Sequence, residues 1–132
     1  MTNFLKDIIK NSGNEYAGVA SEGIDGSDIT GFIDTGSHAF NALLSGSLYG
    51  GIPNNKIIAL AGESATGKSF FALGMCKKFL DDNPEGVVLY FDTEQAITSD
   101  MISERGMDPS RVAVFPVATV ESFRHPAISI VD

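Results

Sequence analysis

From residue 32 onward, short continuous apolar runs alternate with apolar positions at helical spacing. Three runs have the length and composition of strands that are buried on both faces, and they lie at residues 56–61, 87–91 and 111–115. Helical spacing follows the first two runs, at residues 69–80 and 99–105. Strands that alternate with helices predict a parallel sheet with right-handed crossovers, and therefore an α/β fold.

The beginning of the chain has a different pattern. Residues 1–11 predict an amphipathic helix, and residues 12–31 predict a flexible linker because they combine glycines and acidic residues with little apolar material. The apolar side of the helix is formed by Phe4, Leu5, Ile8 and Ile9. Such a stripe has to be covered, and its own domain and a neighbouring subunit are equally good candidates from the pattern alone.

Two more helices are predicted at either end of residues 32–132. Ser37 can cap a short helix over residues 38–44, with Phe40, Leu43 and Leu44 facing inward. Residues 119–132 predict the beginning of another helix. The alternative is that residues 128–132 form a strand that ends in a magnesium-binding Asp132, but the connection from residue 115 is short for a crossover to a parallel strand.

A glycine-rich motif separates the first predicted strand from the helix that follows it. It consists of Gly62, Glu63, Ser64, Ala65, Thr66, Gly67, Lys68 and Ser69, and matches the pattern of a phosphate-binding loop at every fixed position. Gly62 and Gly67 allow successive backbone N–H groups to surround phosphate oxygens, and the helix start adds its own N–H groups. Lys68 is expected to reach the β- and γ-phosphates, and the Ser69 hydroxyl to hold Mg²⁺. The motif predicts a nucleoside triphosphate as the ligand.

Acidic residues follow the second predicted strand. Asp92 and Glu94 lie just beyond residues 87–91, at the carboxyl end of the strand, where open α/β sheets place their ligands. Glu94 is a candidate for polarising an attacking water, and an N-cap or a solvated loop acid is the alternative. Asp92 is the closer competitor for that role, or holds the turn by accepting backbone N–H groups.

Composition and charge narrow the classes of function. The chain has 132 residues, of which 43% are hydrophobic, so it can form one core. No apolar run approaches the ~20 residues that span a bilayer, so we expect a soluble, cytoplasmic protein with no membrane partner. Because the net charge is −8 and only 9 residues are Lys or Arg, we expect the isolated chain to bind DNA poorly.

Several segments together resemble the RecA-type recombinases, and in particular the UvsX-like recombinases of phages. The matching segments are Thr35-Gly36-Ser37, residues 42–46, 50–53, the loop at 62–69, and residues 90–96 and 105–112. The resemblance covers roughly residues 32–120 of the sequence and is specific in order and spacing. It implies a P-loop NTPase core of the RecA type, with residues 32–132 as the first part of that core.

The resemblance implies ATP and Mg²⁺ as cofactors, filament formation on single-stranded DNA and strand exchange in recombination, repair or replication. By motif position, Glu94 would activate the hydrolytic water, and Lys68 and Ser69 would hold the phosphates and the magnesium ion. The helix at residues 1–11 would dock on the next protomer, head to tail, which favours self-association. Met101 stands where many members have an aromatic residue that stacks on adenine.

The family cores are longer than this chain, so we expect the chain to be the N-terminal part of a recombinase. Single-stranded DNA would then bind the full-length protein only. We expect residues 1–132 to bind ATP weakly and to hydrolyse it slowly or not at all. The alternative is a nucleotide-binding or assembly segment that has neither turnover nor DNA binding.

Overall fold

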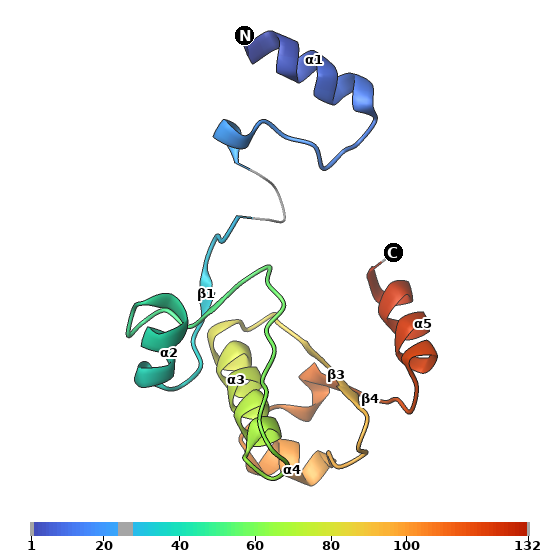
Figure 1. Cartoon of the computed structure of the whole chain (residues 1–132). Coiled ribbons are helices and arrows are strands. Elements are labelled where there is room, and N and C mark those ends of the chain that lie inside the picture. The colour runs from blue at the N-terminus through green and yellow to red at the C-terminus, as the bar shows by residue number, and fades with distance from the viewer. Residues whose placement is uncertain (1, 24–27, 132) are drawn as a thin grey trace. The chain divides into compact units, whose positions relative to one another are not determined.

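The computed structural model describes residues 2–23 and 28–131 of the chain (Figure 1). It divides into two compact units, Met1–Ala61 and Gly62–Asp132. The first unit thus contains the predicted helix and linker together with residues 32–61 of the predicted core. The second unit begins with the glycine-rich motif.

Helix α1 (Thr2–Ser12) confirms the helix predicted at the start of the chain. Its apolar side chains are accessible: Phe4 is 68% exposed and Ile8 is 50% exposed. A short 3-10 helix, η1 (Ala20–Glu22), follows, and its Glu22 forms an ion pair of 2.6 Å with Lys6 of α1. The predicted linker includes residues 24–27, which lie outside the described part of the chain.

The rest of the first unit combines helix α2 (His38–Ser45) with two short strands, β1 (Phe32–Ile33) and β2 (Ile52–Pro53). The strands pair in antiparallel orientation. The Ser37 side chain accepts a hydrogen bond from the backbone N–H of Phe40, which confirms the predicted cap of α2. The inward orientation predicted for Leu43 and Leu44 is wrong, because Leu43 is 81% exposed and Leu44 is 36% exposed.

Asn41 occupies the buried side of α2 instead and is fully buried. Its Oδ1 accepts hydrogen bonds from the backbone N–H of Thr35 at 3.0 Å and from the Thr35 hydroxyl at 2.6 Å. Its Nδ2 donates to the Asp34 carboxylate at 2.8 Å and to the Leu48 carbonyl oxygen at 3.1 Å. The buried side-chain amide of Asn41 therefore links α2 by hydrogen bonds to the segments before and after it.

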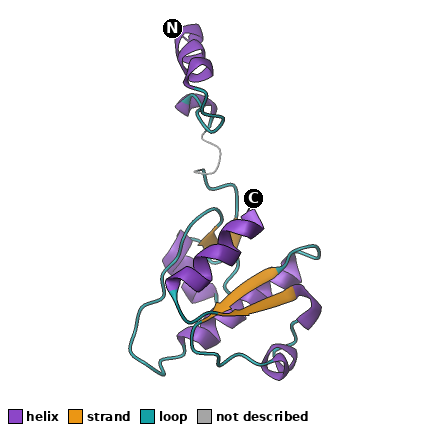
Figure 2. Cartoon of the chain, turned by 90° about the vertical axis from the view of Figure 1, so that its right-hand side faces the viewer, coloured by secondary structure: helices purple, strands orange, loops and turns teal. Residues whose placement is uncertain are grey.

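The second unit is an α/β arrangement. In chain order it contains α3 (Lys68–Asp82), β3 (Val88–Asp92), α4 (Ser99–Glu104), η2 (Pro109–Arg111), β4 (Val112–Pro116) and α5 (Val120–Val131). Strands β3 and β4 are parallel neighbours, with Val88 opposite Val112 (Figure 2). These elements confirm the strands and helices predicted between residues 69 and 115, and the parallel orientation of the pair.

Helices cover both faces of the β3–β4 pair. On one face, Leu73 and Leu80 of α3 form a core with Ile102 of α4 and with Met107. On the other face, the Phe91 ring stacks on Phe115 and meets Phe123 of α5 edge-on, each with 4.8 Å between ring centroids. The alternation of side chains along β3 thus sends Val88 and Tyr90 to the α3–α4 face, and Phe91 to the α5 face.

A side chain from η2 caps the C-terminal end of α3. The Arg111 guanidinium donates hydrogen bonds to the carbonyl oxygens of Leu80 at 3.1 Å and Gly86 at 2.6 Å, and also to that of Asn83. Carbonyl groups at the end of a helix have no partner within the helix, so a cation is well suited to this position.

The strand predicted at residues 56–61 is absent, and the helix predicted near the C-terminus is present. Residues 56–61 form an irregular segment rather than a strand, and Ile57 is fully exposed. An apolar run forms a strand only where a neighbouring strand pairs with its backbone, and β3 is hydrogen-bonded to β4 alone among the described strands. Near the C-terminus, α5 confirms the predicted helix and excludes the alternative strand over residues 128–131, while Asp132 lies outside the described residues.

Candidate functional site

The glycine-rich motif forms an exposed loop that leads directly into α3. Two of its residues have left-handed backbone conformations, Ala65 with φ of 61° and Gly67 with φ of 91°. The space around Gly67 is open, so its backbone angle, rather than crowding, is what favours glycine there. These backbone angles belong to a turn. The N–H groups of the loop are therefore not oriented as they would be in a strand or a helix.

Lys68 is the first residue of α3, and its side chain folds back over the loop. Its Nζ donates hydrogen bonds to the carbonyl oxygens of Gly62 at 3.1 Å and Glu63 at 2.7 Å. The Thr66 hydroxyl donates to the same Glu63 oxygen at 2.8 Å. The partners of the ammonium group are thus neutral carbonyl oxygens, so its charge is available to an anion.

The start of α3 has free hydrogen-bond donors. Gly67 precedes the helix and supplies no side-chain acceptor, and the backbone N–H of Phe71 is bonded to the Gly67 carbonyl oxygen at 2.9 Å. In the described structure, the N–H groups of Lys68, Ser69 and Phe70 have no acceptor. Helix α3 has 15 residues, so its dipole adds to this positive end. The residues present fit a phosphate group that approaches the helix start.

Asp92 ends β3 and holds the turn after it. It is only 6% exposed, and its carboxylate accepts hydrogen bonds from the backbone N–H groups of Glu94 at 3.1 Å, Gln95 at 3.0 Å and Ile97 at 2.9 Å. These bonds, that from Ile97 first, hold the pKa of Asp92 below its usual value. The geometry confirms the turn-holding alternative for Asp92.

Glu94 is exposed, and its backbone is fixed by the Asp92 carboxylate. A cavity of about 260 Å³ beside it is lined by residues of α3, of β3 and its turn, and of α4. The cavity brings Glu94 together with Ser69 and Met101. Lys68 does not line it, and lies at the adjoining loop. Two of the predicted site residues, Ser69 and Glu94, therefore share one concave surface.

Two further residues of this cavity were not predicted from the sequence. Phe70, in the first turn of α3, and Arg105, which follows α4, both line it. The Arg105 guanidinium lies 4.1 Å from the centroid of the Phe70 ring, which is a cation–π contact. The two residues are far apart in the sequence, and only the packing of α4 beside α3 could have indicated that they meet.

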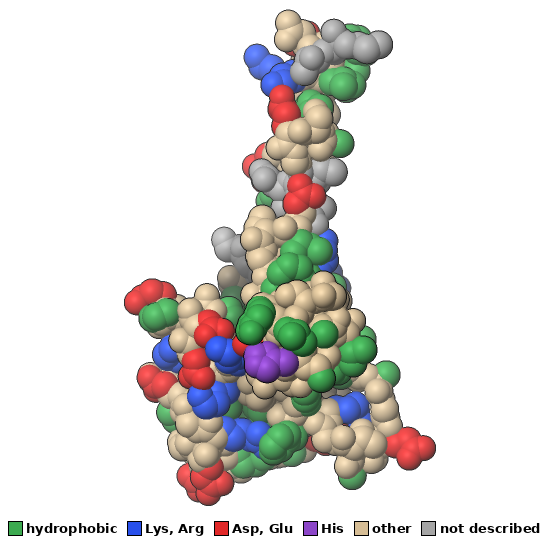
Figure 3. Space-filling model, turned by 90° about the vertical axis from the view of Figure 1, so that its left-hand side faces the viewer, with side chains coloured by type: hydrophobic (Ala, Val, Ile, Leu, Met, Phe, Trp, Pro, Cys, Tyr) green, Lys and Arg blue, Asp and Glu red, His purple; other side chains and the backbone are tan. Residues whose placement is uncertain are grey.

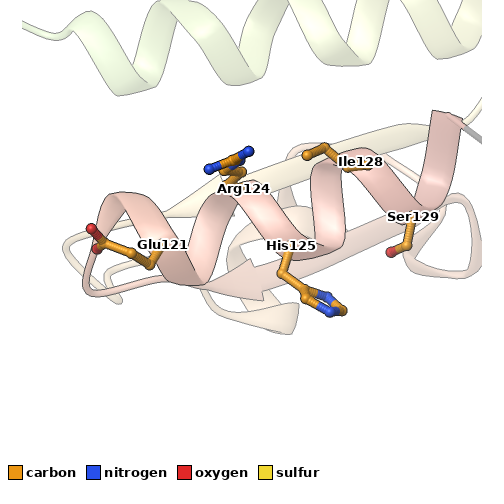
Figure 4. Close-up of a pocket in the computed structure, with 5 residues that line it drawn as sticks. All are labelled: Glu121, Arg124, His125, Ile128 and Ser129. Carbon is orange, nitrogen blue, oxygen red and sulfur yellow. The ribbon is translucent and has the colours of Figure 1, made fainter.

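A larger cavity of about 480 Å³ lies along α5 and contains none of the predicted site residues. It is lined by Glu121, Arg124, His125, Ile128 and Ser129 (Figure 4). Arg124 and Ile128 point to one side of the helix, and His125 points to the other (Figure 4). All five lining residues belong to this one helix, whereas the smaller cavity is lined by residues of several elements.

The described residues contain neither a group of metal ligands nor a helix that could cross a membrane. No three His, Cys, Asp or Glu side chains there are grouped so that they could hold a metal ion. A Mg²⁺ ion that is bound through one hydroxyl and substrate phosphates does not need such a group. Nor does any helix in the described ranges combine the length and the apolar character that crossing a membrane requires.

Over part of its length, the chain is similar to two known proteins. No family model matches it. It is 36% identical over 92 residues to the recombination and repair protein of Enterobacteria phage T4, across 70% of this chain and 23% of that protein. It is 37% identical over 83 residues to the protein RecA of Malacoplasma penetrans, across 63% of this chain and 23% of that protein. The matched segment is therefore less than a quarter of each relative, and over that segment the chain is related to the RecA-type recombinases.

Proposed function

We propose that residues 62–69 bind the phosphates of ATP together with Mg²⁺. The backbone of Gly62, Glu63, Ser64, Ala65, Thr66 and Gly67 would surround the phosphates. Lys68 would neutralise their charge, and the Ser69 hydroxyl would hold the magnesium ion. The observation that carries the proposal is the start of α3, where free N–H groups lie beside an ammonium group that is bonded only to neutral carbonyl oxygens.

We assign the water-activating role to Glu94. Its side chain lines the same cavity as Ser69, and its backbone is fixed by Asp92. The Glu94 carboxylate would orient a water molecule and accept its proton as the water attacks the γ-phosphorus of ATP. The bond between the γ-phosphorus and the bridging oxygen would break, and ADP and phosphate would leave. Lys68 and Glu94 are then the two catalytic side chains.

For the longer protein, we propose ATP-dependent filament formation on single-stranded DNA and strand exchange in recombination or repair. Helix α1 would dock its apolar side on the next protomer, head to tail, which produces an open filament. The accessibility of Phe4 and Ile8 supports this role for α1. Residues 1–132 have a net charge of −8, and basic side chains are scattered among acidic and apolar ones on the face drawn in Figure 3. We therefore expect residues 1–132 alone to bind DNA poorly.

A second candidate function is nucleotide binding or assembly without turnover. It is favoured by the position of Lys68, which is bonded to the carbonyl oxygens of its own loop and does not line the cavity that contains Ser69 and Glu94. Measuring ATP hydrolysis separates the two candidates. If hydrolysis is detected, Glu94→Gln is expected to retain ATP binding and to lower the rate about 100-fold or more. An unchanged rate would assign water activation to another residue.

Titration of the 132-residue chain with ATP and Mg²⁺ in a calorimeter tests the binding proposal. Lys68→Ala is expected to weaken binding at least about tenfold, because a hydrogen bond to a charged group contributes about 1.5–3 kcal/mol. Lys77→Ala is the matched control, because it removes the same charge from the same helix and breaks only a surface ion pair with Asp81. Equal affinities of the two variants would contradict phosphate binding at Lys68.

A further inference from the structure

Arg105 and Phe70 are in contact at the exposed side of α3. The guanidinium lies 4.1 Å from the ring centroid, and the Phe70 side chain is 66% exposed. The pair is therefore at the surface of the cavity and not inside the hydrophobic core, which is formed by Leu73, Leu80, Ile102 and Met107.

Arg105 differs from two lysines in the second half of α3 in its partners. Lys77 and Lys78 form ion pairs with Asp81 and Asp82 on the same helix. The Arg105 guanidinium forms no ion pair or hydrogen bond with any residue that the structure describes, although the chain has a net charge of −8. Its planar group instead lies over an aromatic ring, and its five N–H donors are left for another partner.

The cavity that Phe70 and Arg105 line combines two kinds of chemical group. Ser69 and Glu94 supply oxygen atoms, and Phe70, Met101 and Arg105 supply an aromatic ring, a thioether and a planar cation. The volume of about 260 Å³ is below the range of about 300–1,000 Å³ typical of drug-sized ligands. It is therefore suited to one part of a larger ligand.

Resting on the triphosphate binding proposed above, we propose that Arg105 and Phe70 hold the nucleobase and favour purines. Phe70 follows Lys68 by two positions, so a ligand whose phosphates meet the start of α3 can place its base in the adjoining cavity. Guanidinium groups and aromatic rings both stack on the faces of bases, and a purine offers a larger face than a pyrimidine. The Met101 thioether adds a polarisable contact. Arg105 is thus a specificity-determining residue.

Two probes separate base contacts from phosphate contacts in the 132-residue chain. ATP carries a base, and inorganic tripolyphosphate does not; both are titrated with Mg²⁺. Arg105→Ala is expected to weaken ATP binding about tenfold and to leave tripolyphosphate binding unchanged. Arg124→Ala removes the same charge from α5 and should change neither affinity. Lys68→Ala should weaken both.

The outcomes that overturn the inference are distinct from those that overturn triphosphate binding. Equal weakening of both probes by Arg105→Ala would make Arg105 a phosphate contact, and unchanged ATP binding would make the pair structural. If the unsubstituted chain bound neither probe, triphosphate binding itself would fail, and this inference with it.

Arg105→Lys keeps the charge, removes the planar group and covers the case in which Arg105→Ala does not fold. The unsubstituted chain should bind ATP severalfold more tightly than CTP, and Arg105→Lys should bring that ratio toward one. Phe70→Leu should lower the ratio in the same direction. A ratio that Arg105→Lys leaves unchanged would exclude stacking on the guanidinium.

Discussion

The carboxylate of Asp92 accepts a hydrogen bond of 2.9 Å from the backbone N–H of Ile97. Asp92 ends β3, and Ile97 packs against the core of the second unit. The bond therefore closes the turn that carries Glu94 at the rim of the cavity. A carboxylate that is held by several N–H groups favours its ionised form, which links the stability of this turn to pH.

The first prediction concerns acid stability. Because the pKa of Asp92 is lowered in the folded chain, its stabilising contribution is complete above the unfolded pKa of about 3.9 and is lost as the pH falls through the folded value. Asp92→Asn should lower the stability at neutral pH and show a smaller further loss on acidification. Urea unfolding at a series of pH values from neutral to strongly acidic measures both effects.

Glu85→Gln is the control for this experiment. Glu85 is an exposed carboxylate in the turn after α3, so its substitution should leave the acid-induced loss as it is in the unsubstituted chain. If Asp92→Asn and Glu85→Gln had the same pH profile, Asp92 would not be the group that links this turn to pH.

The second prediction concerns the buried amide of the first unit. Asn41→Leu is similar in size but leaves the Thr35 N–H and the Leu48 carbonyl oxygen without this partner. An unsatisfied buried group costs about 1–3 kcal/mol, so the free energy of unfolding should fall by at least about 2 kcal/mol in urea titrations. Asn54→Leu is the comparison. Asn54 also accepts backbone hydrogen bonds, from Thr30 and Gly31, but water can replace it near the surface, and a loss below about 1 kcal/mol is expected.

The third prediction tests the core between α3 and β3. Leu73 is 2% exposed, so Leu73→Ala should destabilise the second unit by about 2–5 kcal/mol through lost burial and a cavity. Val120→Ala, at a position that is 76% exposed, should change the free energy of unfolding by less than about 0.5 kcal/mol. Circular dichroism during urea unfolding measures both values, and similar values for the two variants would contradict the assignment of the core.

The fourth prediction concerns self-association through α1. Ile8→Glu places a charge on the apolar side of α1 and should shift the chain toward the monomer, because burying an aliphatic side chain contributes about 1.5–3 kcal/mol. Asn11→Glu adds the same charge to the same helix at a polar position. Sedimentation velocity should show a shift for Ile8→Glu only. Equal distributions for Ile8→Glu and the unsubstituted chain would exclude this side of α1 as a contact.

The elements that depend on the spacing of nearby residues could be predicted from the sequence. Helix α3 and the strands β3 and β4 follow from apolar spacing, and the cap at Ser37 follows from one side chain and the helix after it. The strand expected at residues 56–61 fails because a strand depends on a partner that the run itself does not specify.

The candidate site also has features that the sequence could predict and features that it could not. Ser69 and Glu94 could be predicted to meet, because a loop after one element and the carboxyl end of a strand converge at one edge of an α/β unit. Asp92 and Glu94 are both acids after the same strand, and only burial separates them: Asp92 is 6% exposed and bonded to the turn, whereas Glu94 is exposed. The contact of Arg105 with Phe70 depends on tertiary packing, which no spacing in the sequence encodes.

The two ends of α3 have opposite capacities for hydrogen bonding. At its C-terminal end, Arg111 satisfies the carbonyl oxygens of Leu80 and Asn83, while the N–H groups of Lys68 and Ser69 at the other end have no acceptor among the described residues. The start of the helix is therefore suited to a negatively charged partner, whereas its end already holds a cation. This preference for negative charge belongs to the backbone and does not depend on which side chains surround it.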